Sequence, residues 1–305
     1  MKILVTGGAG FIGSHTVDLL IENNHEVVII DNLSSGSRQN INHKAKFYQA
    51  NLNNFEEVEK VFKQENINVI YHFAAQINVR ESVNNPINDA KENILNTLNL
   101  LELAVKYNIK HFIFSSTGGA IYGDTMQLPT NETTKEKPQS PYGCAKLSIE
   151  KYLNFYNKAY NLRYTILRYS NVYGPRQNPH GEAGVIAIFF NQMFNNNDLT
   201  IYGGIQTRDF VYVGDVARAN VAALYENKNQ EYNVATSIET DIIEIFLKIN
   251  KYFKNRFKAD YKEISRGEQK RSCLSYERIK KELNWSPLTS INEGLDKTYC
   301  WYLKR

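Results

Sequence analysis

A tyrosine and a lysine lie four residues apart in Tyr142-Gly143-Cys144-Ala145-Lys146, directly after Pro141. Proline is typical of the first turn of a helix, and residues four apart share a helix face, so the phenol and the ammonium can face one ligand. A nearby cation lowers the pKa of a phenol, which then can take a proton from a hydroxyl group near neutral pH. The chain has 20 tyrosines and this spacing is common by chance. Taken alone, the motif is therefore better explained as an ordinary surface pair.

A glycine-rich segment, Thr6-Gly7-Gly8-Ala9-Gly10-Phe11-Ile12-Gly13, joins the first expected strand to the first expected helix. Gly7, Gly10 and Gly13 would allow a tight turn, close approach of a pyrophosphate and close helix–sheet packing. Asp31 ends the second expected strand, where a carboxylate binds both hydroxyls of an adenine ribose and repels a 2′-phosphate. A flexible turn is the alternative, but the position in a strand–helix–strand unit favours an NAD site. The Tyr142/Lys146 pair follows this site and is therefore predicted to be catalytic.

The elements that must position these residues are short β-branched runs alternating with helical stretches. Strands are expected at 2–7, 27–31, 46–52, 69–75, 111–117 and 164–169, and helices near 11–24, 55–65, 89–107 and 142–160. Continuous apolar runs such as Ile3-Leu4-Val5 indicate strands buried on both faces, as in a parallel sheet covered by helices. We expect an α/β fold with a doubly wound parallel sheet (Rossmann) for residues 1–174.

The segment 174–181 is rich in turn-forming residues and ends this rhythm. Shorter strands are expected beyond it at 199–203, 210–213 and 231–235, with a helix near 276–283. We expect residues 175–305 to form mainly a smaller α/β substrate-binding domain, from which some segments return to the first domain.

The composition excludes several classes of function. The net charge of the 305-residue chain is +4 and its Lys and Arg residues are scattered, which argues against nucleic acid as a partner. No apolar run approaches the length of a membrane span, and no signal peptide is expected. Cys144, Cys273 and Cys300 have no metal-ligand or disulfide spacing, and the six histidines are dispersed. We therefore expect a cytoplasmic protein with no metal site.

Many motifs in one order resemble a known group. They include TGGAGFIGSH at 6–15, DNLSSG at 31–36, YHFAAQ at 71–76, SSTGGAIYG at 115–123, YGCAK at 142–146, LRYSNVYGPRQ at 167–177, PHGEAGVIAIF at 179–189, QTRDFVYVGDVARAN at 206–220 and ELNWSP at 282–287. Over nearly its whole length the chain resembles the extended short-chain dehydrogenases/reductases of the sugar-nucleotide epimerase/dehydratase group. Within that group it is most similar to UDP-glucose 4-epimerases.

The resemblance implies a role for individual residues. Thr117, Tyr142 and Lys146 would be catalytic, with Thr117 touching the 4-oxygen of the sugar. The residues implied to contact NAD are Gly7, Gly10, Phe11, Ile12, Gly13, Asp31, Asn32, Ser35, Gly36, Asn51, Leu52, Phe73, Ala74, Ala75, Gln76, Asn93, Ser115, Tyr142, Lys146 and Tyr169. Those implied to contact a UDP-sugar are Thr117, Tyr142, Asn171, Gly184, Val185, Thr200, Ile201, Tyr202, Arg208, Arg266, Arg271 and Ser272.

Two positions depart from the pattern of the group. Asn51-Leu52 stands where an acidic residue usually binds the adenine amino group, and an Asn accepts that hydrogen bond more weakly. The late loop reads Ser265-Arg266-Gly267-Glu268, which moves the usual arginine by one place. Either Arg266 or Arg271 would then bind the diphosphate.

The alternatives differ in chemistry. Dehydratases and decarboxylases of the group have a carboxylate just after the catalytic threonine, whereas here Thr117 precedes Gly118-Gly119-Ala120, which can donate no proton. A UDP-glucuronate 4-epimerase stays open. A non-enzymatic NAD-binding regulator would typically lack the Tyr142/Lys146 pair. The prediction is a UDP-hexose 4-epimerase that oxidises C4 transiently and retains its NAD.

Two finer expectations concern substrate range and assembly. The resemblance places Ser272 where a bulky Tyr would exclude N-acetyl groups, so UDP-GlcNAc and UDP-GalNAc are expected substrates beside UDP-Glc and UDP-Gal. The helices near 89–107 and 142–160 have apolar side chains on more than one face: Leu95, Leu98, Leu101, Val105, Leu147, Tyr152, Leu153 and Tyr156. Because members of the group dimerise through such helices, we expect a homodimer.

Overall fold

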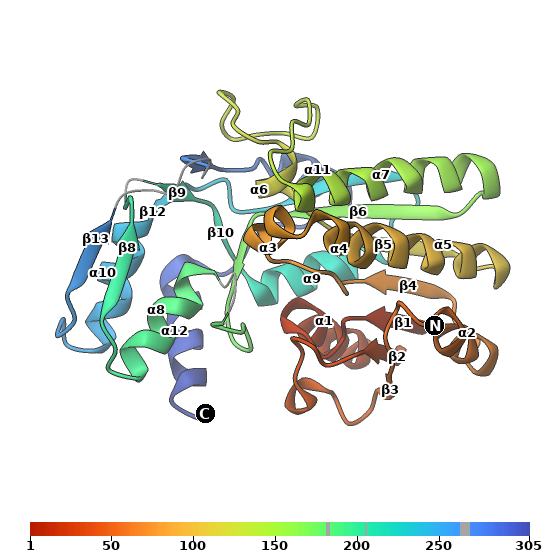
Figure 1. Cartoon of the computed structure of the whole chain (residues 1–305), viewed down its shortest axis with the longest axis horizontal. Coiled ribbons are helices and arrows are strands. Elements are labelled where there is room, and N and C mark those ends of the chain that lie inside the picture. The colour runs from red at the N-terminus through yellow and green to blue at the C-terminus, as the bar shows by residue number, and fades with distance from the viewer. Residues whose placement is uncertain (181–183, 205, 263–268) are drawn as a thin grey trace.

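A computed structural model of the chain describes residues 1–180, 184–204, 206–262 and 269–305. The larger of its two parts is built on a seven-stranded, wholly parallel sheet with strand order β11-β6-β5-β4-β1-β2-β3 (Figure 1). These strands are β1 (Lys2–Thr6), β2 (Glu26–Asp31), β3 (Lys46–Gln49), β4 (Val69–His72), β5 (His111–Thr117), β6 (Arg163–Tyr169) and β11 (Gln230–Val234). The predicted Rossmann-type sheet is confirmed.

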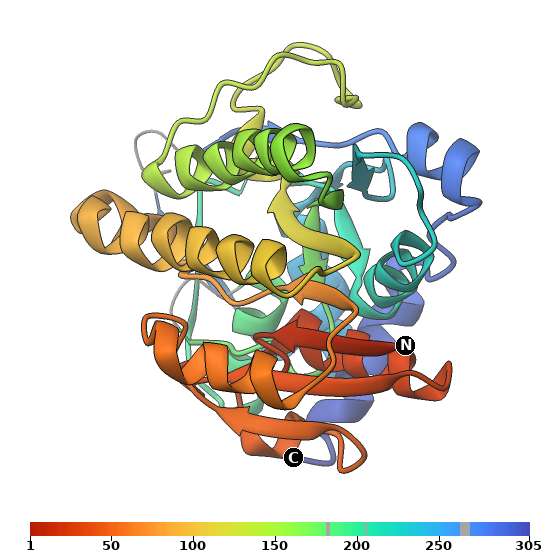
Figure 2. The same cartoon turned by 90° about the vertical axis from the view of Figure 1, so that its right-hand side faces the viewer.

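Helices cover both faces of this sheet, which Figure 2 shows between two helical layers. One layer consists of α2 (Phe55–Gln64), α5 (Asn96–Lys106) and α7 (Pro141–Tyr160), and the other of α1 (Phe11–Glu22), α9 (Val213–Ala223) and α11 (Glu277–Leu283). Alternate residues of one strand enter opposite cores: Leu4 packs under the first layer, and Ile3 and Val5 pack under the second. Burial on both faces explains the continuous apolar runs of the sequence.

The connection between β4 and α5 is irregular. It contains α3 (Val79–Asn84), α4 (Pro86–Ala90) and a π-helical segment, η2 (Lys91–Leu95), which leads directly into α5. The single helix predicted near 89–107 is therefore three joined pieces. Two short elements complete this part: the 3-10 helix η1 (Arg38–Asn40) and α6 (Gly118–Ile121).

As far as it is described, the smaller part contains three helices and three small sheets. Its helices are α8 (Val185–Phe194), α10 (Ile242–Tyr252) and α12 (Ile291–Tyr302). Its strands are β7 (Asn171–Tyr173) with β10 (Phe210–Tyr212), β8 (Leu199–Tyr202) with β13 (Ala259–Lys262), and β9 (Thr207–Arg208) between β12 (Thr240–Asp241) and β14 (Arg271–Ser272). A core that includes Phe189, Phe190 and Phe246 holds these elements together.

Three segments beyond residue 174 return to the larger part. β11 pairs with β6 at the edge of the large sheet, α9 packs on α1, and α11 packs on β11. The division of the chain into domains at residues 1–174 and 175–305 therefore stays a proposal. Among the described residues, no helix is both long and apolar enough to cross a membrane.

Candidate functional site

The glycine-rich turn lies between β1 and α1, beside the segment that follows β4. Gly7 has a φ of +71°, and a Cβ there would lie 2.6 Å from the backbone nitrogen of Ala74. A Cβ on Gly13 would overlap the carbonyl oxygen of Gly7. Only glycine therefore fits this turn without displacing backbone. In the described structure no side chain caps the N-terminus of α1, whose N-cap is Gly10, so Phe11 and Ile12 begin a helix whose first N–H groups can face an anion.

Asp31 is fixed at the carboxyl end of β2. Its two carboxylate oxygens accept hydrogen bonds from the backbone N–H groups of Ala9 (3.0 Å) and Leu33 (2.8 Å). The loop after it, which contains Asn32, Ser35 and Gly36, folds against Ala9, because the N–H of Ser37 donates to the Ala9 carbonyl at 3.0 Å. The carboxylate and the glycine-rich turn therefore form one surface. This arrangement fits the ribose and the pyrophosphate of a dinucleotide.

The remaining residues predicted to contact the cofactor follow the carboxyl ends of neighbouring strands. Asn51 and Leu52 follow β3, Phe73, Ala74, Ala75 and Gln76 follow β4, Ser115 lies near the end of β5, Tyr169 ends β6, and Asn93 lies in η2. Phe73 and Ala74 both donate backbone hydrogen bonds to the carbonyl of Thr6. Tyr169 is buried and donates its hydroxyl to Asn220 at 2.8 Å. The parallel sheet thus gathers segments distant in sequence at one edge.

The Tyr142/Lys146 pair lies in the first turns of α7. Ser140 caps this helix by accepting the N–H of Gly143, and Pro141 begins it. The ammonium of Lys146 lies 5.9 Å from the centre of the Tyr142 ring and donates a hydrogen bond of 3.0 Å to the Ser115 carbonyl. Lys146 is only 4% exposed, and this burial lowers its pKa to about 8. The two side chains therefore share a helix face, as their spacing predicts.

Thr117 ends β5 and caps α6, where its hydroxyl accepts the N–H of Ala120 at 3.3 Å. The two glycines after it leave room for neighbours. A Cβ on Gly118 would overlap the side chain of Leu274, and a Cβ on Gly119 would lie 4.0 Å from the hydroxyl of Ser272. The turn after the threonine therefore lies against β14, and it presents no carboxylate.

The residues predicted to contact a UDP-sugar come from several elements of the smaller part. Asn171 begins β7, Gly184 and Val185 begin α8, Thr200, Ile201 and Tyr202 lie in β8, Arg208 lies in β9, and Arg271 and Ser272 form β14. Ile201 is buried in the core of this part, so only its backbone can meet a ligand. Arg271 is bound in bidentate fashion to the carboxylate of Glu239. Arg266 lies outside the described residues.

The sequence did not predict two buried carboxylates, one near the predicted sugar contacts and one beside the predicted cofactor contacts Gln76 and Asn93. Asp209 is fully buried and accepts hydrogen bonds from the backbone of Thr236, Ser237 and Leu274, which fixes the strand end beyond Ser272. Asp89, in α4, is 2% exposed and accepts hydrogen bonds from two amide side chains. The spacing of four residues between Asp89 and Asn93 was the sequence signal for the hydrogen bond between them.

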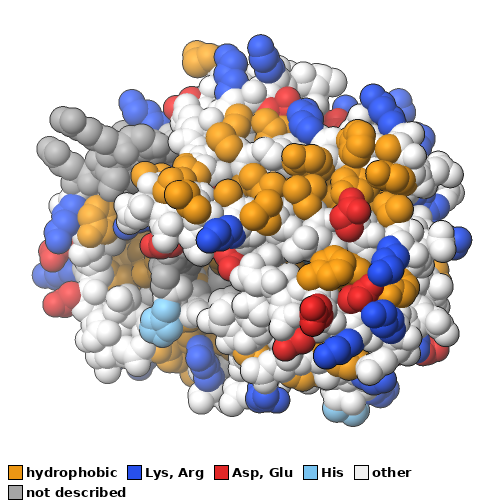
Figure 3. All heavy atoms as spheres, turned by 45° about the vertical axis from the view of Figure 1, so that its right-hand side comes forward, with side chains coloured by type: hydrophobic (Ala, Val, Ile, Leu, Met, Phe, Trp, Pro, Cys, Tyr) orange, Lys and Arg blue, Asp and Glu red, His pale blue; other side chains and the backbone are white. Residues whose placement is uncertain are grey.

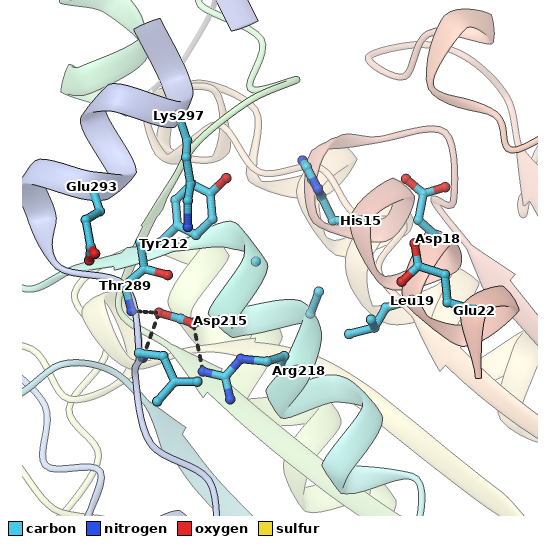
Figure 4. Close-up of a pocket in the computed structure, with 13 residues that line it drawn as sticks. His15, Asp18, Leu19, Glu22, Tyr212, Asp215, Arg218, Thr289, Glu293 and Lys297 are labelled. Atoms are coloured by element: carbon cyan, nitrogen blue, oxygen red, sulfur yellow. Dashed lines mark hydrogen bonds and ion pairs between the residues drawn. The ribbon is translucent and has the colours of Figure 1, made fainter. Parts of the chain in front are cut away.

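A cavity with a volume of about 550 Å³ lies elsewhere (Figure 4). His15, Asp18 and Glu22 of α1 face residues of α9 and of the C-terminal segment across it. Its polar walls are largely engaged: Asp215 binds Arg218 and the backbone N–H groups of Leu288 and Thr289. We interpret it as a gap between packed elements. Among the described residues, no group of three or more His, Cys, Asp or Glu side chains could hold a metal ion.

Comparison with known proteins agrees with this geometry. Residues 3–235 match the NAD dependent epimerase/dehydratase family. The chain belongs to this family. A putative UDP-glucose 4-epimerase of Methanocaldococcus jannaschii is 48% identical over 98% of this chain and 97% of the relative.

Two solved structures are similar over the whole length of this family member. The UDP-glucose 4-epimerase of Thermotoga maritima with UDP-glucose has a TM-score of 0.97 at 46% identity, covering 100% of this chain and 99% of that one. The UDP-glucose 4-epimerase of Thermus thermophilus in complex with NAD has a TM-score of 0.95 at 38% identity, covering 99% of each chain. The cofactor of the family is NAD, as the glycine-rich turn and Asp31 predict.

Proposed function

We propose that this protein is a UDP-glucose 4-epimerase, an isomerase that interconverts UDP-glucose and UDP-galactose. The observation that carries the proposal is the buried Lys146 ammonium, held on the Ser115 carbonyl beside Tyr142 at the same sheet edge as the dinucleotide turn. The similarity to UDP-glucose 4-epimerases of known structure supports the choice of substrate.

NAD fits the residues present. The turn at Gly7 and Gly13 has no room for a Cβ, and Asp31 is fixed where an adenine ribose would offer two hydroxyls. When bound, NAD supplies a hydride acceptor for C4 of the sugar and returns the hydride later. Because the cofactor is regenerated in each turnover, it need not leave the protein, and purified protein should release NAD(H) on denaturation.

Tyr142 is proposed to move the proton of the sugar. Its phenol oxygen would take the proton of the 4-hydroxyl as C4 is oxidised and would give it back when C4 is reduced. Lys146 would keep a positive charge beside the phenol and hold the nicotinamide ribose. Thr117 would hydrogen-bond the 4-oxygen from the end of β5. Inversion requires hydride return to the opposite face of C4, so the sugar has to turn over within the site.

The turn after Thr117 favours epimerisation over elimination. Loss of water from the sugar, or of carbon dioxide, needs a side chain that can move a further proton. Gly118 cannot be replaced by a larger residue without overlap with Leu274, and Gly119 faces Ser272. We propose that the oxidised sugar therefore has no route other than return of the hydride.

Binding of the UDP group is assigned to the smaller part. We propose that Arg208 and either Arg266 or Arg271 meet the diphosphate, because guanidinium groups suit charge-assisted hydrogen bonds with phosphate oxygens. Since Arg271 is bound to Glu239, it would have to release that carboxylate before it could bind the diphosphate. Asn171, the Gly184–Val185 backbone and β8 would contact the rest of the nucleotide.

The space near Ser272 is proposed to admit N-acetylated sugars. Ser272 is buried, and it lies next to the turn that follows Thr117. A serine leaves room that a tyrosine ring would fill, so UDP-GlcNAc and UDP-GalNAc should also be interconverted. Ser272→Tyr should abolish turnover of the N-acetylated pair and spare UDP-Gal. Equal survival of both activities would show that Ser272 does not set the sugar range.

Assembly as a homodimer in the cytoplasm is part of the proposal. Hydrophobic side chains gather in a band across the face formed by α5 and α7 (Figure 3). Leu95, at the end of η2, is 52% exposed, and Tyr152 and Phe155 of α7 are 41% and 53% exposed. Leu101 and Leu153 are buried in the core. Light scattering should give twice the mass of one chain, and a strict monomer would argue for an uncovered face.

The proposed reaction has a direct test. Purified protein is incubated separately with UDP-Glc, UDP-GlcNAc and UDP-glucuronate, and the products are resolved by chromatography. Formation of UDP-Gal from UDP-Glc supports the proposal. Turnover of UDP-glucuronate alone would assign the other 4-epimerase activity. Formation of a 4-keto-6-deoxy sugar in place of a 4-epimer would assign a dehydratase.

A further inference from the structure

Asp89 is a buried carboxylate for which the proposed reaction has so far no use. It lies in α4 at 2% exposure, and one of its oxygens accepts hydrogen bonds from Gln76 Nε2 and Asn93 Nδ2, both at 2.9 Å. Burying a carboxylate is costly unless charges or hydrogen bonds compensate it. A carboxylate kept at this position therefore calls for a reason.

The two amides that bind Asp89 fix the segment after β4. Asn93 accepts the backbone N–H of Gln76 at 3.0 Å and donates to the carbonyl of Gln76 at 2.9 Å. The same segment runs beside Gly7, since the backbone of Ala74 donates to the Thr6 carbonyl. Asn93 lies in the π-helical segment η2, a form of helix often found at functional sites. Asp89 thus anchors the amides that hold one wall of the cofactor channel.

The helix that carries Asp89, α4, packs against α7, which carries Lys146. Of the two carboxylates that act on Lys146, Asp89 has the larger electrostatic effect and Glu150 the smaller. Glu150 is already paired with the buried guanidinium of Arg168 and accepts the Ser116 hydroxyl at 2.6 Å. Within the described part of the chain, the side chains that donate hydrogen bonds to Asp89 are the neutral amides of Gln76 and Asn93. Burial raises the pKa of Asp89, and the hydrogen bonds from Gln76 and Asn93, followed by the charge of Lys146, oppose that rise.

We propose that Asp89 is a positioning residue of the epimerase site: its carboxylate anchors Gln76 and Asn93 along the cofactor channel and keeps the buried ammonium of Lys146 charged. The proposal rests on the function proposed above. It gives this carboxylate two separable tasks, one of hydrogen bonding and one of charge.

The groups around Lys146 agree with this assignment. Burial lowers its pKa to about 8, and Asp89 and Glu150 oppose that effect. Tyr142 lies on the same helix, and the charge of Lys146 acts on His72 in β4. His72 stays neutral because burial lowers its pKa to about 3. Removing the charge of Asp89 would therefore let Lys146 lose its proton at lower pH.

Asp89→Asn separates the two tasks, because an asparagine still accepts the amide hydrogen bonds but has no charge. The pH dependence of kcat/KM for UDP-Gal is measured for this variant and the wild type. The alkaline limb of Asp89→Asn should lie about one pH unit lower, the effect typical of a nearby opposite charge. Glu92→Gln, which removes a more exposed carboxylate from η2, is the matched control and should leave the limb in place.

Asp89→Glu tests the charge from the other side and serves if Asp89→Asn does not fold. It keeps the charge while displacing the hydrogen bonds, so the limb should stay within a few tenths of a unit of the wild type and NAD should be retained less well. A wild-type limb in Asp89→Asn, or the same downward move in Asp89→Glu, would overturn the proposal.

Retention of NAD supplies a readout that needs no sugar. After gel filtration at a series of pH values, Asp89→Asn should lose bound NAD at a pH about one unit below the wild type. If the wild type turns over no UDP-hexose, the proposed function fails while this measurement still decides the role of Asp89. Identical NAD loss in Asp89→Asn and the wild type would count against that role.

Discussion

The buried ammonium of Lys146 should make the enzyme lose activity in mildly alkaline solution. A lysine in water keeps its charge well above pH 9, but burial lowers the pKa of Lys146 to about 8. Because the proposed mechanism uses the charged form, kcat/KM should fall as pH rises through this value.

The magnitude follows from the fraction of charged lysine. With a pKa of about 8, roughly nine tenths of the side chain is charged at pH 7 and roughly one tenth at pH 9. The value of kcat/KM for UDP-Gal should therefore fall about tenfold between these two pH values. An ordinary, exposed lysine would give almost no change over the same range.

The assay measures initial rates of UDP-Glc formation from UDP-Gal at low substrate concentration, with circular dichroism and NAD content recorded at each pH. Lys146→Arg keeps a positive charge that cannot be titrated here, so whatever activity remains should be flat between pH 7 and 9. A wild-type profile that is also flat to pH 9, with the fold and cofactor intact, would refute the link between burial of Lys146 and catalysis.

Three further substitutions test other parts of the argument. Tyr142→Phe should lower kcat by about 100- to 10,000-fold with NAD still bound, and a loss of only a few-fold in steady-state rates would remove the phenol from the mechanism. Gly7→Ala places a Cβ at a φ of +71° against backbone, so it should destabilise the fold by about 1–3 kcal/mol in urea unfolding and reduce NAD retention; wild-type stability would contradict the tight turn. Arg168→Met leaves the carboxylate of Glu150 buried without its partner and should cost about 3–5 kcal/mol, part of which a second change, Glu150→Gln, should restore.

Local patterns were sufficient to predict the first half of the fold. The strand at Val69–His72 and the helix at Pro141–Tyr160 have strong signals, namely a buried β-branched run in the first and a proline and a capping serine in the second. The glycine-rich turn was equally clear, since steric limits at Gly7 and Gly13 admit no other residue type.

The later helices were harder to predict. α8 contains apolar residues on nearly every face, so its sequence has little helical periodicity, and it was not predicted. The end of α4, η2 and α5 were predicted as one helix near 89–107, because the π-helical segment at Lys91–Leu95 adds a residue to the turn without a sequence signal. Asp89 was missed for a related reason: its partners, Gln76 and Asn93, are brought to it by this irregular backbone.

The place of β11 at the edge of the large sheet has a consequence for the newly made chain on the ribosome. Until residues 230–234 have been translated, β6 presents an unpaired edge whose residues Thr165 and Leu167 end up buried in the folded protein. An open strand edge is a template for pairing with other chains. The first 174 residues made by themselves should therefore aggregate. For the same reason, neither domain of this enzyme should fold as an independent unit when it is exchanged between homologues.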